Sequence, residues 1–217
     1  MMLPGSFSVN EMKKKYLYID SSLDVQIGII NENYEWEHLE HISHKKSSTI
    51  LHRTIFNIMS EFKLDFDQLA GVIIANGPGS YTGIRLTEGI SQILKNEGVS
   101  TYSFYHFEVP AFCQINDYVF YANAFKGEVF KYVYNNGKEN LAIINKDEFK
   151  SLDFDVANLF HINGELEDMY LNSTKELIDK RARDIFSRII ERGTHLEPFY
   201  FRSLEKEFKP SQKSIGK

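Results

Sequence analysis

Residues 71–94, GVIIANGPGSYTGIRLTEGISQIL, decide the fold of this chain, because they read as a strand, a glycine-rich turn and a helix in direct succession. Residues 71–75 form a short apolar run bounded by glycine and asparagine, as expected of a strand that is covered on both faces. After Gly83, apolar residues recur at helical spacing, and Gly98 stands where a glycine commonly ends a helix. The stretch therefore predicts one strand–turn–helix unit of an α/β fold.

The turn in this stretch has two interpretations. Its characteristic residues are Gly77, Pro78, Gly79, Ser80, Thr82 and Gly83. A strand that feeds a helix through a glycine turn aims free backbone N–H groups at one point, which makes a natural anion site. However, the G-x-G-x-x-x-G spacing is longer than the dinucleotide fingerprint, and no Gly-Lys-Ser/Thr follows it. The spacing alone therefore favours a tight turn that binds nothing, with Ser80 or Thr82 capping the helix.

Composition describes a folded protein and excludes several classes. The 217 residues are 42% hydrophobic and 14% aromatic, which argues against extended disorder. The net charge of −5 disfavours a stand-alone nucleic-acid binder, and a single cysteine excludes an internal disulfide. No apolar run approaches the ~20 residues of a membrane span, and the N-terminus lacks the apolar core of a signal peptide. We therefore expect a cytoplasmic protein without a membrane segment.

The order of patterns along the chain predicts two lobes. Residues 1–11 show no periodicity and are expected to form a flexible extension. Residues 12–115 would form the first lobe, and residues 116–217 a second lobe and tail. Each half opens with a strand, a turn and a strand, which indicates two lobes that are built alike.

Local signals place further elements. Residues 47–62 carry one apolar stripe of a helix. Asn136-Gly137 is typical of a hairpin turn. Ser173 and Glu176 form a capping box that opens a helix through residue 191, and Gly193 would end that helix.

Two groups of polar residues invite a ligand. Asp20, Ser21 and Ser22 end the first strand, where a carboxylate and hydroxyls could hold magnesium and phosphate. The same residues could equally close a turn, and the local pattern favours the turn. The second group is His38, His41, His44 and His52. Its spacing is weak for a metal, so we expect solvated histidines rather than the zinc site of a metallopeptidase.

Four segments together resemble one protein family. They are LYIDSS (17–22), GPGSYTGIR (77–85), GEVF (127–130) and EPFYFR (197–202). In their order and spacing they resemble the TsaB family of bacterial tRNA threonylcarbamoyladenosine biosynthesis proteins. The nine-residue loop is the specific element, and the resemblance covers most of residues 15–209.

This resemblance implies a two-lobed α/β fold of the actin, Hsp70 and sugar-kinase (ASKHA) type with a shortened C-terminal lobe. It also implies a non-catalytic scaffold that binds the transferase subunit TsaD through the first lobe, engages the ATPase TsaE and meets tRNA only through the complex. A homodimer is the alternative assembly for the chain alone. No cofactor, metal or catalytic residue is implied.

By the same resemblance, helices 47–62 and 83–94 would present one docking surface. We expect it to include Leu51, Ile55, Arg85, Leu86, Ile90, Ile93 and Leu94. The chain departs from the family at Thr87, Glu88 and Ile93, where relatives carry small or apolar residues. We expect these departures to lie on the docking surface.

The main alternative is an enzyme of the same fold. A small phosphotransferase or nucleotide hydrolase would use Asp20 to place magnesium and the loop from Gly77 to Gly83 to hold phosphate. Against this, residues 47–62 lack the His-x-x-x-His pair with which the catalytic relatives hold a metal, and the second half lacks another long glycine-rich loop.

Overall fold

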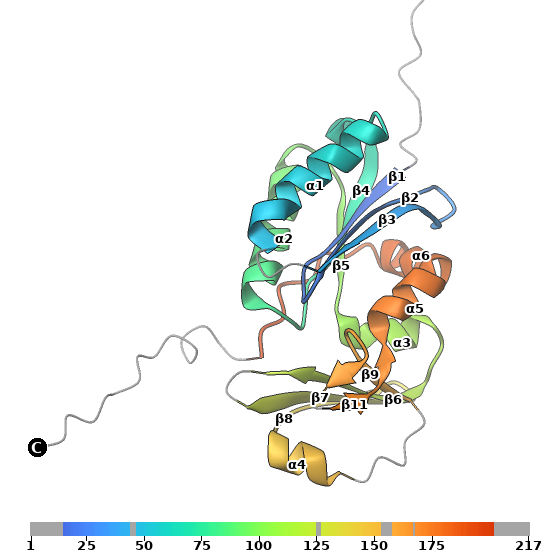
Figure 1. Ribbon diagram of the computed structural model, residues 1–217. Coiled ribbons are helices and arrows are strands. Elements are labelled where there is room, and N and C mark those ends of the chain that lie inside the picture. The colour runs from blue at the N-terminus through green and yellow to red at the C-terminus, as the bar shows by residue number, and fades with distance from the viewer. Residues whose placement is uncertain (1–14, 44–46, 125–126, 153–157, 167, 202–217) are drawn as a thin grey trace, which may run out of the picture.

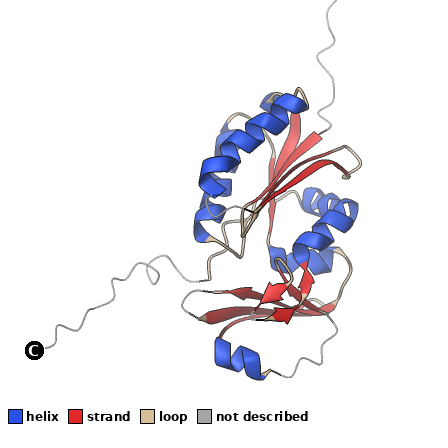
Figure 2. Ribbon diagram, viewed as in Figure 1, coloured by secondary structure: helices blue, strands red, loops and turns tan. Residues whose placement is uncertain are grey.

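The computed structural model describes residues 15–43, 47–124, 127–152, 158–166 and 168–201. In Figure 1, helices and sheets alternate in layers. Helices α1 (Ser47–Glu61) and α2 (Tyr81–Asn96) cover one face of a first sheet. Helices α5 (Thr174–Lys180) and α6 (Ala182–Arg192) cover its other face. A second sheet follows, with the short helix α4 (Lys146–Ser151) beyond it (Figure 2).

The first sheet has the strand order β3-β2-β1-β4-β5. β1 pairs with β2, and β2 with β3, in antiparallel fashion, whereas β1, β4 and β5 are parallel. Tyr18 of β1, for example, lies opposite Gly28 of β2 and Ile73 of β4. The strands are β1 (Lys15–Asp20), β2 (Val25–Ile30), β3 (Trp36–Ile42), β4 (Leu69–Ala75) and β5 (Thr101–Phe104).

The second sheet repeats this arrangement, with β6 in the place of β1. Read from the other edge its order is β8-β7-β6-β9-β12, antiparallel from β8 to β6 and parallel from β6 to β12. Its strands are β6 (Asp117–Asn123), β7 (Glu128–Asn135), β8 (Lys138–Asn145), β9 (Leu159–His161) and β12 (Asn172–Ser173). Two lobes built alike are therefore confirmed.

The second lobe is the shorter copy. α4 has 6 residues where α1 has 15, and β9 has 3 residues where β4 has 7. The 16-residue α2 is replaced by a small hairpin of β10 (Glu165–Leu166) and β11 (Met169–Tyr170). The predicted ASKHA-type fold with a shortened C-terminal lobe is thus confirmed. The remaining elements are the 3-10 turns η1 (Phe66–Gln68) and η2 (His106–Glu108) and helix α3 (Val109–Phe112).

The core lies between these layers. Leu51 and Ile55 of α1 and Leu94 of α2 pack on one face of the first sheet. On the other face, Tyr18 meets Phe186 of α6. An aromatic cluster on the second sheet joins Phe107, which follows β5, to Phe199 near the end of the described chain. Each fully buried aliphatic or aromatic side chain contributes roughly 1.5–3 kcal/mol. Because each cluster combines residues from different helices and strands, the layers stabilise one another.

Most local signals define the ends of elements as expected. Ser80 caps α2 by accepting a hydrogen bond from the Gly83 N–H, and Ser173 does the same for Glu176. Gly193 ends α6 with φ of 66°. The single helix predicted to run through residue 191 is instead two helices, because Arg181 leaves the helical conformation at φ −124°, ψ 31°.

The structure bears on the expected lack of a membrane segment but not on the expected N-terminal extension. Within the described ranges, no helix is long and apolar enough to cross a membrane. Residues 1–14 and 202–217 lie outside the described residues, so the expected flexible extension at 1–11 stays a prediction.

Candidate functional site

The glycine loop between β4 and α2 packs against the end of β1. A Cβ on Gly79 would lie 2.4 Å from the carbonyl oxygen of Ser22, and one on Gly83 only 1.8 Å from that of Ser21. Both distances are far below a normal contact, so only glycine fits at these two positions. Gly77 has φ of 113° and lies as close to Phe199, whose carbonyl oxygen would be 2.8 Å from an added Cβ. The loop glycines thus serve close packing within the chain.

Polar groups of the loop already have partners inside the protein. The Ser80 N–H donates to the Ser22 carbonyl at 2.5 Å, and the Gly83 N–H donates to Ser80 Oγ at 3.3 Å. The Gly77 carbonyl accepts from the His106 N–H at 2.8 Å. These bonds support the tight-turn interpretation, because an anion would have to displace them.

Asp20 is the centre of a buried polar cluster between the lobes. Its Oδ1 accepts hydrogen bonds from the Ser22 N–H at 2.7 Å and the Ser22 hydroxyl at 2.6 Å. Its Oδ2 lies 3.1 Å from His106 Nε2 and 3.5 Å from Lys175 Nζ. Burial would raise the pKa of Asp20, but Lys175 and His106 outweigh it and hold that pKa below its ordinary value. The carboxylate is therefore ionised and internally neutralised.

His106 and Lys175, the two partners of Asp20 Oδ2, each make a further contact within the protein. His106, which follows β5, places Nδ1 2.9 Å from Thr174 Oγ1 at the start of α5. Lys175 Nζ donates to the Asp24 carbonyl at 2.6 Å. Sequence reasoning missed both partners, because they lie 86 and 155 residues from Asp20 along the chain. The Lys175 ammonium stands where a cation would sit beside this carboxylate.

The other two members of the predicted magnesium and phosphate site are engaged as well. Ser21 Oγ donates to the Gly83 carbonyl at 2.8 Å and also contacts the Thr87 hydroxyl. Ser22 donates hydrogen bonds to Asp20 from both its backbone N–H and its hydroxyl. No group of three or more acidic, histidine or cysteine side chains within the described ranges could hold a metal ion. This arrangement ties strands, loop and helix together and offers magnesium little access.

The histidines do not gather. His41 Nε2 pairs with Asp179 at 3.4 Å, while His38 stacks edge-on against Phe62. His52 is exposed on α1, and His44 lies outside the described residues. The three described histidines thus have separate surroundings.

The residues predicted for the docking surface divide into two groups. Arg85 and Ile93 are exposed and Leu86 is half-buried. Leu51, Ile55, Ile90 and Leu94 are instead buried in the core. The apolar stripe that suggested them is the face each helix turns toward the sheet, so a partner could not reach these four side chains in this conformation.

One exposed side chain was missed. Phe56 of α1 is 70% exposed and Ile93 of α2 is 62% exposed, and the two helices contact each other. A large apolar residue off the inward stripe is the signal that could have identified Phe56.

The departures at Thr87 and Glu88 are internal rather than on the surface. Thr87 is buried beside Ser21. Glu88 accepts hydrogen bonds from Asn76 Nδ2 at 2.9 Å and Gln92 Nε2 at 2.9 Å, and lies 3.0 Å from His195 Nε2. Burial raises the pKa of Glu88, and these three partners together bring that pKa below its ordinary value. Glu88 therefore fastens the segment around His195 to α2, and the expectation that Glu88 lies on the docking surface was wrong.

Comparison with known proteins found a curated relative from the family that the four segments resemble. No protein-family model matches the chain. It is 35% identical over 83 residues to "tRNA threonylcarbamoyladenosine biosynthesis protein TsaB" of Buchnera aphidicola, a match that covers 38% of each chain. The chain thus matches less than half the length of this curated relative. The resemblance to TsaB is confirmed by this alignment.

Solved structures share the fold. YeaZ from Pseudomonas aeruginosa is 18% identical, with a TM-score of 0.57 over 86% of this chain and 99% of its own. An uncharacterized protein with similarity to peptidase YEAZ, from the same organism, is 17% identical, with a TM-score of 0.60 over 87% of this chain and all of its own. At such identities these matches support the two-lobed fold alone.

Proposed function

We propose that this chain, which resembles TsaB in sequence, is a non-catalytic subunit of the bacterial machinery that makes threonylcarbamoyladenosine in tRNA. The observation that carries the proposal is the alignment with TsaB, together with the GPGSYTGIR loop packed on the end of β1. In this proposal the chain works in the cytoplasm, requires no cofactor of its own and meets tRNA only through its partners.

The state of Asp20 supports a scaffold rather than a phosphotransferase. A phosphotransferase of this fold would need a carboxylate free to bind hydrated magnesium. Here the Asp20 carboxylate is fully buried, Lys175 already balances its charge, and His106 lies within hydrogen-bond distance of it. Freeing it would require breaking a buried ion pair, which typically costs several kcal/mol.

The outward faces of α1 and α2 are the proposed docking surface for a TsaD-like subunit. Phe56 and Ile93 expose large apolar side chains there, and Arg85 contributes a positive charge. Exposed apolar side chains on adjoining helices are typical of a protein interface. The TsaE-like ATPase would join the resulting heterodimer, and the same surface could pair two copies of the chain when the partner is missing.

Pull-down of the cognate TsaD, followed by a reconstituted tRNA modification assay, tests the proposal. We expect the chain to bind TsaD and to stimulate modification. Phe56→Asp and Ile93→Asp should each weaken binding at least tenfold, since a charge would be buried in an apolar contact.

Tyr170→Asp is the matched control, because Tyr170 is 89% exposed on the small hairpin of the second lobe. It should leave TsaD binding unchanged. Circular dichroism of each variant separates loss of binding from loss of folding. A well-folded wild-type chain that neither binds TsaD nor stimulates modification would refute the proposed function.

A further inference from the structure

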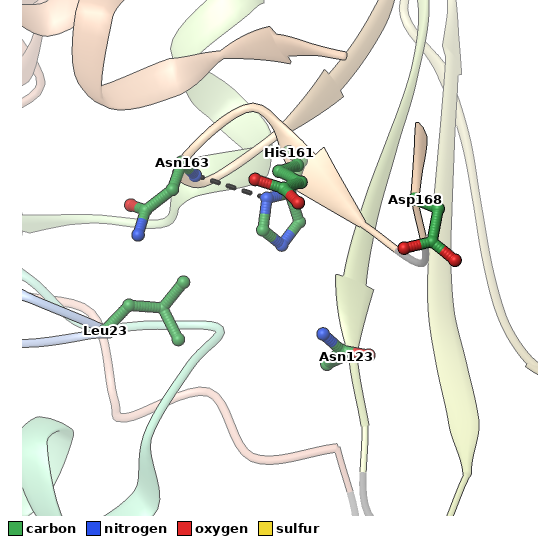
Figure 3. A pocket seen from close by; sticks show the side chains of 6 residues that line it. Leu23, Asn123, His161, Asn163 and Asp168 are labelled. Carbon is green, nitrogen blue, oxygen red and sulfur yellow. Dashed lines mark hydrogen bonds between the residues drawn. The ribbon is translucent and has the colours of Figure 1, made fainter. Parts of the chain in front are cut away.

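A polar pocket of about 470 Å³ lies in the cleft between the lobes and takes no part in the function proposed above. Leu23 comes from the first lobe, and the other lining residues come from the second: Asn123, His161, Asn163, Glu165 and Asp168. Figure 3 labels the side chains of Leu23, Asn123, His161, Asn163 and Asp168 around the pocket.

The pocket has a location that often binds ligands. Asn123 is the last residue of β6 and His161 the last of β9, and these two strands are parallel neighbours. From β6 the chain turns to β7 on one side, whereas β9 leads to β12 on the other. Ligands of α/β sheets bind at such a switch point, outside the carboxyl ends of the strands.

His161 supplies an unused donor to this space. Only 3% of the residue is exposed, and its Nδ1 accepts a hydrogen bond from the Asn163 N–H at 3.2 Å. Burial and the nearby His106 lower the pKa of His161 to about 4, so the ring is neutral at pH 7 with its proton on Nε2. Nε2 points into the space between Leu23 and Asn123 (Figure 3), and it has no acceptor among the described residues.

The remaining polar groups restrict the charge of a ligand. Glu165 and Asp168 bring two carboxylates, and no lysine or arginine among the described residues lines the pocket, so an anion would be repelled. A simple cation would pair with the carboxylates, but it could not accept the hydrogen bond that the His161 N–H offers. Hydroxyl groups both donate and accept, and therefore match both kinds of protein group.

We propose that this pocket binds a small uncharged polyol, such as a monosaccharide ring, whose hydroxyls donate to Glu165 and Asp168 and accept from His161 and Asn123. Leu23 would contact the apolar edge of the ring. Carboxylates that accept hydrogen bonds from sugar hydroxyls are a known means of recognising ribose in other folds.

Saturation-transfer NMR on the full chain tests this site. The probes are D-ribose, D-glucose and myo-inositol, each at millimolar concentration, with D-glucose 6-phosphate and spermidine as charged comparisons. We expect at least one uncharged probe to bind, and to bind at least tenfold more tightly than either charged probe. The proposal is overturned if no uncharged probe gives a signal, or if the phosphate or the polyamine binds best.

Variants locate the binding. Asn123→Leu removes an exposed amide, and Asp168→Asn removes one carboxylate while keeping a residue that tolerates the φ of 66° at this position. Asp168→Asn should weaken polyol binding about tenfold, the loss expected for a hydrogen bond to a charged group, and Asn123→Leu should weaken it roughly threefold, as expected for a neutral hydrogen bond. Asp147→Asn on α4 is the matched control and should have no effect. Equal binding by all three variants would place the polyol elsewhere and overturn the proposal.

Discussion

Single residues explain why the glycine loop is a structural device. Gly83 sits in the first turn of α2, buried against the Ser21 carbonyl, whereas Gly89, further along the same helix, would meet nothing within 4 Å of an added Cβ. Substitutions at these two glycines can therefore distinguish the effect of close packing from the general cost of glycine in a helix. One is required by its neighbour and the other is not.

We predict opposite signs for alanine at these two positions. Gly83→Ala should destabilise the chain by about 1–3 kcal/mol or more, because its Cβ would overlap backbone. Gly89→Ala should instead stabilise it by roughly 0.5–1 kcal/mol, the gain from replacing a helical glycine. Urea denaturation of both variants measures the difference. Equal unfolding free energies would show that the loop adjusts to a side chain at Gly83.

His161 gives a pH dependence whose direction follows from its pKa. The unfolded histidine titrates near pH 6.5, and the folded one at about 4. Between these values the unfolded state binds more protons, so stability falls as the pH falls from 6.5 to 4. His161→Asn keeps an acceptor for the Asn163 N–H but has no imidazole to titrate. The variant should therefore lack this pH-dependent fall in stability, which amounts to up to about 3 kcal/mol.

Urea denaturation of wild type and His161→Asn at several pH values checks this expectation. All other titrating groups are common to the two proteins and cancel in the difference. The difference in unfolding free energy should change across pH 6.5 to 4 and stay level above pH 7. A constant difference would mean that the imidazole is protonated in the folded chain at pH 5.

At the scale of elements, the segment from Thr194 to Tyr200 connects parts that the sequence keeps apart. Asn76 donates to the Leu196 carbonyl at 2.7 Å and accepts from the Phe199 N–H at 2.9 Å. Glu88 reaches the same segment through His195. Phe199 then packs on Phe107, which follows β5, and on Phe130 of the second lobe. The segment has no regular structure, yet it bridges α2 and the second sheet.

Glu88→Leu should release this segment. Asn76 and His195 would each lose a buried partner, so we expect a destabilisation of about 1–3 kcal/mol. In hydrogen-exchange measurements on Glu88→Leu, the Phe199 N–H should exchange faster with solvent than it does in the wild type. The β1 amides, which remain in the sheet, should exchange at their wild-type rates. Lys95→Leu, an exposed change on the same helix, should alter stability by no more than about 1 kcal/mol. An unchanged exchange rate at Phe199 would mean that aromatic packing, and not Glu88, holds the segment in place.

Elements of this chain were predictable where the signal was local. The stripe of α1, the capping box at Ser173 and the Asn136-Gly137 turn depend on neighbours within a few residues, and positive φ at both Asn136 and Gly137 agrees with the predicted turn. The break at Arg181 was not predicted, because the apolar spacing continues through it. The same stripe misled us about Leu51 and Leu94, since periodicity identifies an apolar face but not what covers it.

At the scale of the whole molecule, the repeat of strand–turn–strand predicted both sheets, but not the contacts between them. His106 and Lys175 reach Asp20 from η2 and α5, and no local pattern marks either residue as its partner. Lys175 in the first turn of a helix is mildly unfavourable to the helix dipole, and that is the one hint the sequence offers. The buried cluster depends on the tertiary arrangement alone.

A double-mutant cycle should measure this connection. Lys175→Met leaves the Asp20 carboxylate buried with less compensation, and should cost about 3–5 kcal/mol of stability. Asp20→Asn combined with Lys175→Met should cost less than the sum of the single changes, with a coupling of at least about 1 kcal/mol. Thermal or urea unfolding of the four proteins gives the coupling. Strict additivity would show that the ion pair makes no net contribution across the lobes.

The covering of the first sheet by α5 and α6 has a consequence for biosynthesis. Tyr18, Ile73 and Phe104 are completed early, but the helices that bury them come from residues 174–192. At roughly 5–20 residues per second, a ribosome needs about 4 to 18 seconds to make the chain from Phe104 to the end of α6. During that interval one face of the first sheet is apolar and uncovered. The nascent chain therefore passes through a stage at which this apolar face is open to aggregation or to a chaperone until its own later helices are made.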